Sequence, residues 1–87
     1  MKRKERNEEI RGYLSQTLGV INKISLPKTE IEKDYIENIL WAIDRLNTKI
    51  NSNERILNSE LDMLHRVCLA YHKLNSDVKF VLKQKFL

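Results

Sequence analysis

The chain has 87 residues, of which 32% are charged and 41% hydrophobic, and its formal net charge is +4. This length predicts a single small domain over residues 1–87 with a modest core and little room for a deep substrate cleft. The composition excludes a disordered chain. No apolar run approaches the ~18 residues of a membrane span, so we expect no membrane partner. The single cysteine excludes an internal disulfide, and we therefore expect a cytoplasmic protein.

The N-terminal stretch MKRKERNEE is basic, and no apolar segment follows it, so we do not expect a secretory signal. We interpret residues 1–6 as a mobile basic arm. Its basic side chains would be the nucleic-acid-binding residues of an alternative function: Lys2, Arg3, Lys4 and Arg6. They include no aromatic residue that could stack on a base, so we expect the arm to support only weak, salt-sensitive binding.

The first predicted helix covers residues 4–24, because apolar residues recur there at spacings of three and four. They are Ile10, Tyr13, Leu14, Leu18, Ile21 and Ile24. Gly12, Ser15 and Gly19 lie off this apolar stripe. They are either tolerated small residues that weaken a surface helix or a smooth seam that another backbone can approach.

The second predicted helix covers residues 30–50. Pro27 ends the first helix, and Thr29 with Glu32 forms a capping box that opens the second one. The apolar face of this helix comprises Ile36, Ile39, Leu40, Ile43, Leu46 and Ile50. At about 100° per residue, Trp41 lies roughly opposite this face.

Trp41 is the main candidate for a functional residue, and Asp34, Glu37 and Arg45 share its outward face. One interpretation is that Trp41 is a core residue that covers a fourth helix or the N-terminal arm. The other is that it is exposed beside Arg45, a composition typical of protein-binding hot spots. We adopt the second interpretation and predict a protein-binding site at these four residues.

The third predicted helix covers residues 54–74, after a turn and cap at residues 51–53. Asn75 and Ser76 are expected to end the third helix. Ser76 is expected to cap a short fourth helix that runs to the end of the chain through Val78, Val81 and Leu82. Three long helices with short connections predict an all-α fold. It is an antiparallel bundle of three long helices plus a short C-terminal fourth helix.

Glu60 is anomalous, because it falls among apolar residues on the face of the third helix that should be buried. A bare buried carboxylate is costly, so we expect a partner at Tyr13, Tyr35 or a lysine.

The stretch HRVCLAYH places His65, Cys68 and His72 along one stripe of the third helix. A zinc site needs about four N or S ligands, and the two histidines are about 10.5 Å apart along the helix axis. We interpret Cys68 as a buried residue between two boundary histidines and expect no metal or cofactor. The alternative is a metal shared with a second chain.

The stretch AIDRLNTKINSNERILNSELDMLHRVCLAYHKLNSDVKFVLKQKFL, about half the chain, resembles the region that precedes the helix-turn-helix of phage-encoded sigma-like late-gene regulators. Leu74, Leu82 and Phe86 match that family's K-L-x-x-x-x-x-x-x-L-x-x-x-F/Y segment. The sequence ends where the DNA-reading helices of the family would begin. The resemblance therefore implies a protein-contacting part without the reader, and it carries no functional residue to this chain.

No phosphate-binding motif and no catalytic constellation occurs in the sequence, so we do not expect an enzyme. The expected function is that of a small helical protein that binds another protein, as a phage or mobile-element regulator or an inhibitor of a host protein. The partner is a protein, with a homodimer as one possibility. The alternatives are a nucleic-acid-binding transcription regulator and a bacteriocin-immunity-like bundle.

Overall fold

In a computed structural model, the chain forms three helices: α1 (Arg3–Asn22), α2 (Glu30–Asn51) and α3 (Asn58–Leu74). The structure describes residues 2–24 and 29–81. Within these ranges there is no strand, so the prediction of an all-α chain with three long helices is confirmed. No helix of this part of the chain is long and apolar enough to cross a membrane.

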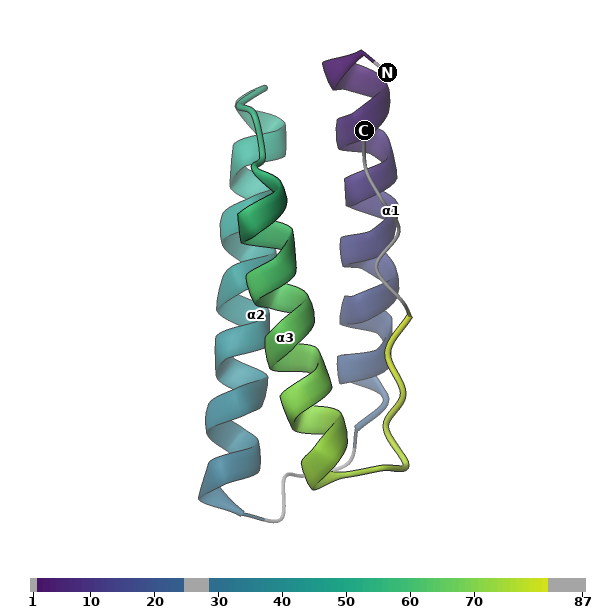
Figure 1. The fold of residues 1–87 in the computed structure, drawn as a ribbon, viewed down its shortest axis with the longest axis vertical. Helices are drawn as coiled ribbons and strands as arrows, with labels where there is room; N and C mark the ends of the chain where they lie inside the picture. Colours follow the sequence, from purple (N-terminus) through teal and green to yellow (C-terminus); the bar gives the residue numbers. More distant parts are fainter. Residues whose placement is uncertain (1, 25–28, 82–87) are drawn as a thin grey trace.

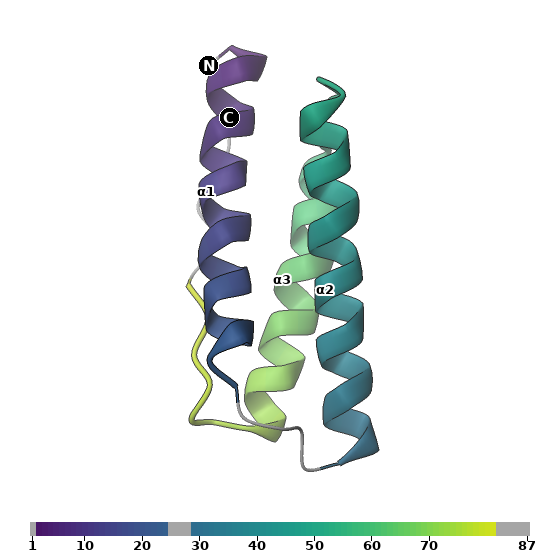
Figure 2. The ribbon, with the colours of Figure 1, turned by 180° about the vertical axis from the view of Figure 1, so that it is seen from behind.

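The three helices lie side by side in an elongated molecule of 41 × 21 × 20 Å (Figure 1). Figures 1 and 2 show that the chain reverses direction between consecutive helices. α2 packs against both α1 and α3. One long edge of α2 therefore borders α3, while another borders α1.

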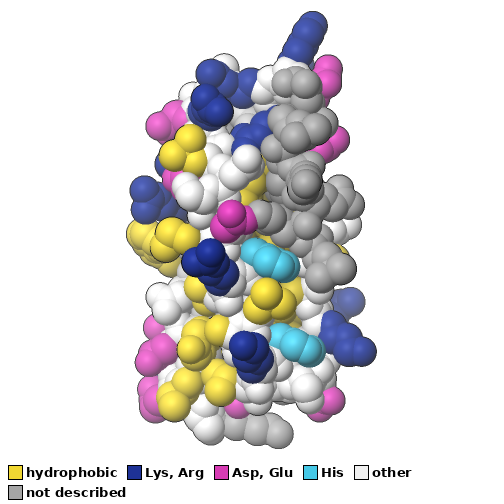
Figure 3. Space-filling model, in the orientation of Figure 1, with side chains coloured by type: hydrophobic (Ala, Val, Ile, Leu, Met, Phe, Trp, Pro, Cys, Tyr) yellow, Lys and Arg dark blue, Asp and Glu magenta, His cyan; other side chains and the backbone are white. Residues whose placement is uncertain are grey.

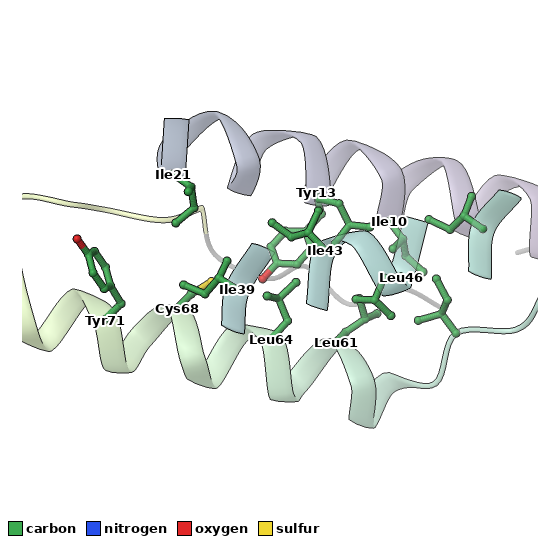
Figure 4. Packing of buried hydrophobic residues seen from close by; sticks show 13 residues of the cluster. Ile10, Tyr13, Ile21, Ile39, Ile43, Leu46, Leu61, Leu64, Cys68 and Tyr71 are labelled. Atoms are coloured by element: carbon green, nitrogen blue, oxygen red, sulfur yellow. The ribbon is translucent and has the colours of Figure 1, made fainter. Parts of the chain in front are cut away.

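The core consists of apolar side chains from all three helices, which meet along the length of the molecule (Figure 4). Its buried members are Ile10, Tyr13, Leu14, Ile21, Ile39, Ile43, Leu46, Ile50, Ile56, Leu61, Leu64, Cys68 and Tyr71. Most of these positions follow the spacing of three and four that the sequence predicts. The apolar stripes of the three helices thus form a single core.

The two ends of α2 are fixed by different capping interactions. At its start, the hydroxyl oxygen of Thr29 accepts a hydrogen bond from the Glu32 N–H at 3.1 Å, as the sequence predicts. At its end, Asn53 has φ of 56°, the left-handed conformation that asparagine tolerates better than most residues. The Asn53 N–H then donates to the Ile50 carbonyl, and the Glu54 N–H to the Lys49 carbonyl. These two bonds form a Schellman motif, which ends the helix.

The start of α3 differs from the prediction, because residues 54–57 are extended and the helix begins at Asn58. The side chain of Ile56 is fully buried in the core. The Arg6 guanidinium donates one hydrogen bond to the Ile56 carbonyl at 2.6 Å and another to Asn58 Oδ1 at 3.0 Å. Contacts with α1 therefore hold open a segment that local sequence patterns assign to a helix.

The predicted fourth helix is wrong for residues 76–81, which form a turn followed by an extended segment; Leu82 and the residues after it lie outside the described part of the chain. Figures 1 and 2 show the extended segment running beside α1. Val78 and Phe80 are half-buried, whereas Lys79 between them is exposed. This alternation is the two-residue period of an extended chain, and it lets both apolar side chains face the core.

Of residues 1–6, interpreted from the sequence as a basic arm, Arg3, Lys4 and Arg6 belong to the first turns of α1. Arg3 donates to the Asn53 carbonyl at 3.4 Å, and Arg6 holds the α2–α3 connection. Two of the four basic residues thus make contacts within the molecule.

Candidate functional site

An open groove with a volume of about 330 Å³ lies between α2 and α3. We call it the α2–α3 groove. Its lining is mostly apolar and comprises Asn38, Trp41, Ala42, Arg45 and Leu46 from α2, with Glu60, Met63, Leu64 and Val67 from α3. Figure 3 shows hydrophobic side chains gathered where α2 and α3 adjoin, with charged side chains among them.

Trp41 stands at the mouth of this groove, and 64% of its surface is exposed. The core residues Ile39 and Ile43 lie two positions before and after it, so Trp41 points away from the core, as its helical phase predicts. The interpretation of Trp41 as a core residue is therefore wrong. The guanidinium carbon of Arg45 lies 5.5 Å from the centre of the indole ring, within the range of a cation–π interaction.

Further exposed apolar side chains extend the groove beyond Trp41. Met63 on the opposite wall is 67% exposed. Ile31 lies two turns from Asn38 on the same face of α2, and Leu74 lies two turns from Val67 on the same face of α3. Asn38 and Val67 both line the groove, so Ile31 and Leu74 continue its two walls as exposed apolar side chains.

Met63 is an exposed residue of the groove lining that the sequence analysis did not single out. Its position is two residues from the buried Leu61, which turns it about 160° away from that side chain. Its helical phase relative to Leu61 is the signal that could have found it.

Glu60 lines the groove and has the partner that its position requires. Lys49 donates a hydrogen bond to Glu60 Oε1 and forms an ion pair with it, and the Leu57 N–H donates to Oε2 at 2.9 Å. Partial burial disfavours the charged carboxylate, but the hydrogen bonds from Lys49 and Leu57 and the charges of Lys49 and Arg45 outweigh it. The pKa of Glu60 is therefore held below its usual value. The predicted lysine partner is Lys49, and Glu60 also caps α3.

The structure brings only two of the four predicted site residues into the groove lining, Trp41 and Arg45. Asp34 and Glu37 are exposed on α2, on the same outward face as Trp41 but outside the groove. They therefore belong to the charged border of the Trp41 surface.

The stretch HRVCLAYH lies within α3, and Cys68 is buried in the core, as predicted. Burial raises the pKa of its thiol to about 12, which keeps it protonated and unreactive. His72 Nδ1 lies 2.6 Å from the Val78 carbonyl and fastens the extended segment. Figure 3 shows the two imidazoles of the chain apart on one face. Among the described residues, no three His, Cys, Asp or Glu side chains gather as a metal-binding group.

The other two candidate surfaces lie away from the groove. Lys2 and Lys4 are exposed at the start of α1, whereas Arg3 and Arg6 bind backbone carbonyls of the α2–α3 connection. A Cβ atom added at Gly12 or Gly19 would meet no atom within 4 Å. These glycines therefore serve no close approach within the described part of the chain.

No family model, no curated protein and no solved structure matches the chain. The resemblance to sigma-like phage regulators therefore stays a prediction.

Proposed function

We propose that this protein is a non-enzymatic module that binds another protein through the α2–α3 groove, on a platform formed by the antiparallel bundle of its three helices. The observation that carries the proposal is Trp41, 64% exposed and held by Arg45 at the mouth of an apolar groove. Tryptophan and arginine are enriched among the residues that dominate binding energy at protein interfaces.

Covering this surface would remove a continuous apolar area from water. Trp41 and Met63 are both about two-thirds exposed on facing walls of the groove, although side chains of this size usually lie inside a protein. Contiguous exposed apolar patches with a polar border mark interaction sites. The border here contains Arg45 and Glu60 within the groove and Asp34 and Glu37 beside it.

The nucleic-acid alternative has less support. Arg3 and Arg6 donate to backbone carbonyls within the molecule, so their guanidinium groups are partly committed. Control of a host protein by a phage or mobile element is one setting in which a protein-binding module would work, and it stays a prediction. No observation favours the bacteriocin-immunity alternative.

Co-purification with matched variants tests the proposed function. Trp41→Ala should weaken retention of a partner about thirtyfold, because a tryptophan at a desolvated interface contributes about 2 kcal/mol. Leu69→Ala is the control, since Leu69 is exposed on α3 about 120° away from Met63. Retention of the same partner by the Trp41 variant and the wild type would contradict the proposal, as would equal losses in both variants.

A further inference from the structure

The outward face of α2 has a symmetric arrangement of residues about Trp41. Asp34, Glu37, Trp41, Arg45 and Thr48 follow one another at intervals of three, four, four and three residues, and all five are exposed. The two residues before Trp41 are acidic, while the two after it are a guanidinium and a hydroxyl. Read in either direction from Trp41, the positions repeat, and Glu37 and Arg45 at the positions nearest to Trp41 carry opposite charges.

This arrangement fits a second copy of the same face. If two α2 helices pack antiparallel with a two-fold axis at Trp41, the residue four positions before Trp41 faces the residue four positions after it in the other copy. Glu37 then faces Arg45 of the second copy, and the symmetry makes this pair twice. Asp34 correspondingly faces Thr48 of the second copy, an uncharged residue whose hydroxyl donates to the Asp44 carbonyl of its own helix at 3.0 Å. A two-fold interface requires this kind of self-complementary surface.

We propose that the protein forms a two-fold symmetric homodimer through α2, with Trp41 at the axis. This inference rests on the proposed function and names the partner as a second copy of the chain. A uniformly acidic or basic partner would leave either Glu37 or Arg45 opposite a like charge, whereas a second copy pairs both. The antiparallel arrangement also sets the helix dipoles of the two copies in opposition, which is favourable.

The α2–α3 groove supplies the apolar part of the interface. Its volume of about 330 Å³ lies within the range of sites that enclose small ligands, so an indole ring from the second copy can enter it. Met63 lies on its far wall and Ile31 at its extension, both more than half exposed. The mixed charges surround this apolar strip, as a polar rim surrounds the centre of a protein interface.

Charge reversal at the paired positions tests the dimer by sedimentation equilibrium of the full chain. The wild type should self-associate with a dissociation constant on the order of micromolar, as for a small interface. Glu37→Arg and Arg45→Glu should each weaken self-association roughly thirtyfold, since each turns two attractive pairs into repulsive ones. Glu9→Arg on the exposed surface of α1 is the matched control and should leave association unchanged.

Two combinations separate a direct pairing from a general effect of charge. The double variant Glu37→Arg/Arg45→Glu restores opposite charges across the axis and should dimerise again. An equimolar mixture of the two single variants should form a heterodimer, because every cross pair then joins an arginine to a glutamate. The emission of Trp41, the only tryptophan in the chain, should shift to the blue on dimerisation and report the same equilibria.

A wild-type chain that stays monomeric up to about 1 mM would overturn the homodimer. Dimerisation of both single variants with wild-type affinity would also overturn it, because the interface would then lie elsewhere. These results are distinct from failure of the proposed function. A monomer that still captures another protein through Trp41 would reject the second copy and leave the binding surface in place.

Discussion

The two extended segments of the chain, residues 54–57 and 78–81, resemble each other in construction but differ in how firmly they are held. Both follow helices, and the sequence assigns both to helices. In each, a side chain from a helix contacts a backbone carbonyl at 2.6 Å: Arg6 contacts Ile56, and His72 contacts Val78. A tertiary contact of this kind can hold a segment extended against its local helical preference.

The first segment has the stronger support. Ile56 is fully buried, the Arg6 guanidinium has two acceptors on either side of the α3 start, and the Glu60 carboxylate binds the Leu57 N–H. In the second segment Val78, Phe80 and Val81 are only partly buried. The rings of Tyr71 and Phe80 make an edge-to-face contact, with their centroids 6.2 Å apart. Because fewer buried contacts hold it, the second segment should open locally before the first.

The largest expected difference between the segments is in their apolar anchors. Ile56→Ala should lower the free energy of unfolding by about 2–5 kcal/mol, because it leaves a cavity in a filled core. Val78→Ala should cost only about 1 kcal/mol, since Val78 is half exposed. Urea denaturation of both variants measures the difference. Equal losses would show that the two segments are anchored equally.

The next effect concerns the guanidinium that holds the first segment. Arg6→Ala should cost about 2 kcal/mol, because it removes charge-assisted hydrogen bonds and leaves the Ile56 carbonyl without this donor. Arg6→Lys keeps the charge but loses the bidentate geometry of the guanidinium, so it should be more stable than Arg6→Ala but less stable than the wild type. Lys4→Ala, at an exposed position of the same helix, is the control. If the two alanine variants unfold alike in urea, Arg6 does not anchor the segment.

A smaller effect should appear in the pH dependence of stability through Glu60. Its pKa is lower in the folded chain, so it stabilises the fold above its unfolded pKa of about 4.5, and this contribution is lost as pH falls through the folded value. Glu60→Gln should cost about 1 kcal/mol at pH 7, and the deficit should disappear in acid. Glu54→Gln, at an exposed position of the same connection, is the matched control variant. A deficit in thermal stability that persists at pH 2 would contradict this explanation.

The sequence predicts the features of the fold that depend on neighbours along the chain. The α2 start at Thr29, the approximate extent of α1 and α2, and the outward direction of Trp41 follow from capping chemistry and helical period. The late start of α3 could not be predicted, because it depends on Arg6, which lies 50 residues from Ile56. The groove has the same limitation, since only packing sets Trp41 and Met63 on facing walls. The partner of Glu60 could be narrowed to Tyr13, Tyr35 or a lysine, but not to Lys49.

The smallest effect concerns Tyr71, the aromatic residue against which the second segment packs. Tyr71 is fully buried, and its hydroxyl has no hydrogen-bond partner in the described part of the chain. Tyr71→Phe keeps the ring contact with Phe80 and removes an unsatisfied buried group, so the free energy of unfolding should rise by up to about 1 kcal/mol. Tyr13→Phe is the matched comparison and should lower it, because the Tyr13 hydroxyl, unlike that of Tyr71, is not left unsatisfied in the core; burial is the main cause that raises the pKa of Tyr13 to about 12. Calorimetry of both variants measures the two signs. A loss of stability in Tyr71→Phe would mean that the hydroxyl has a polar partner, and the buried group beside the second segment would then be satisfied.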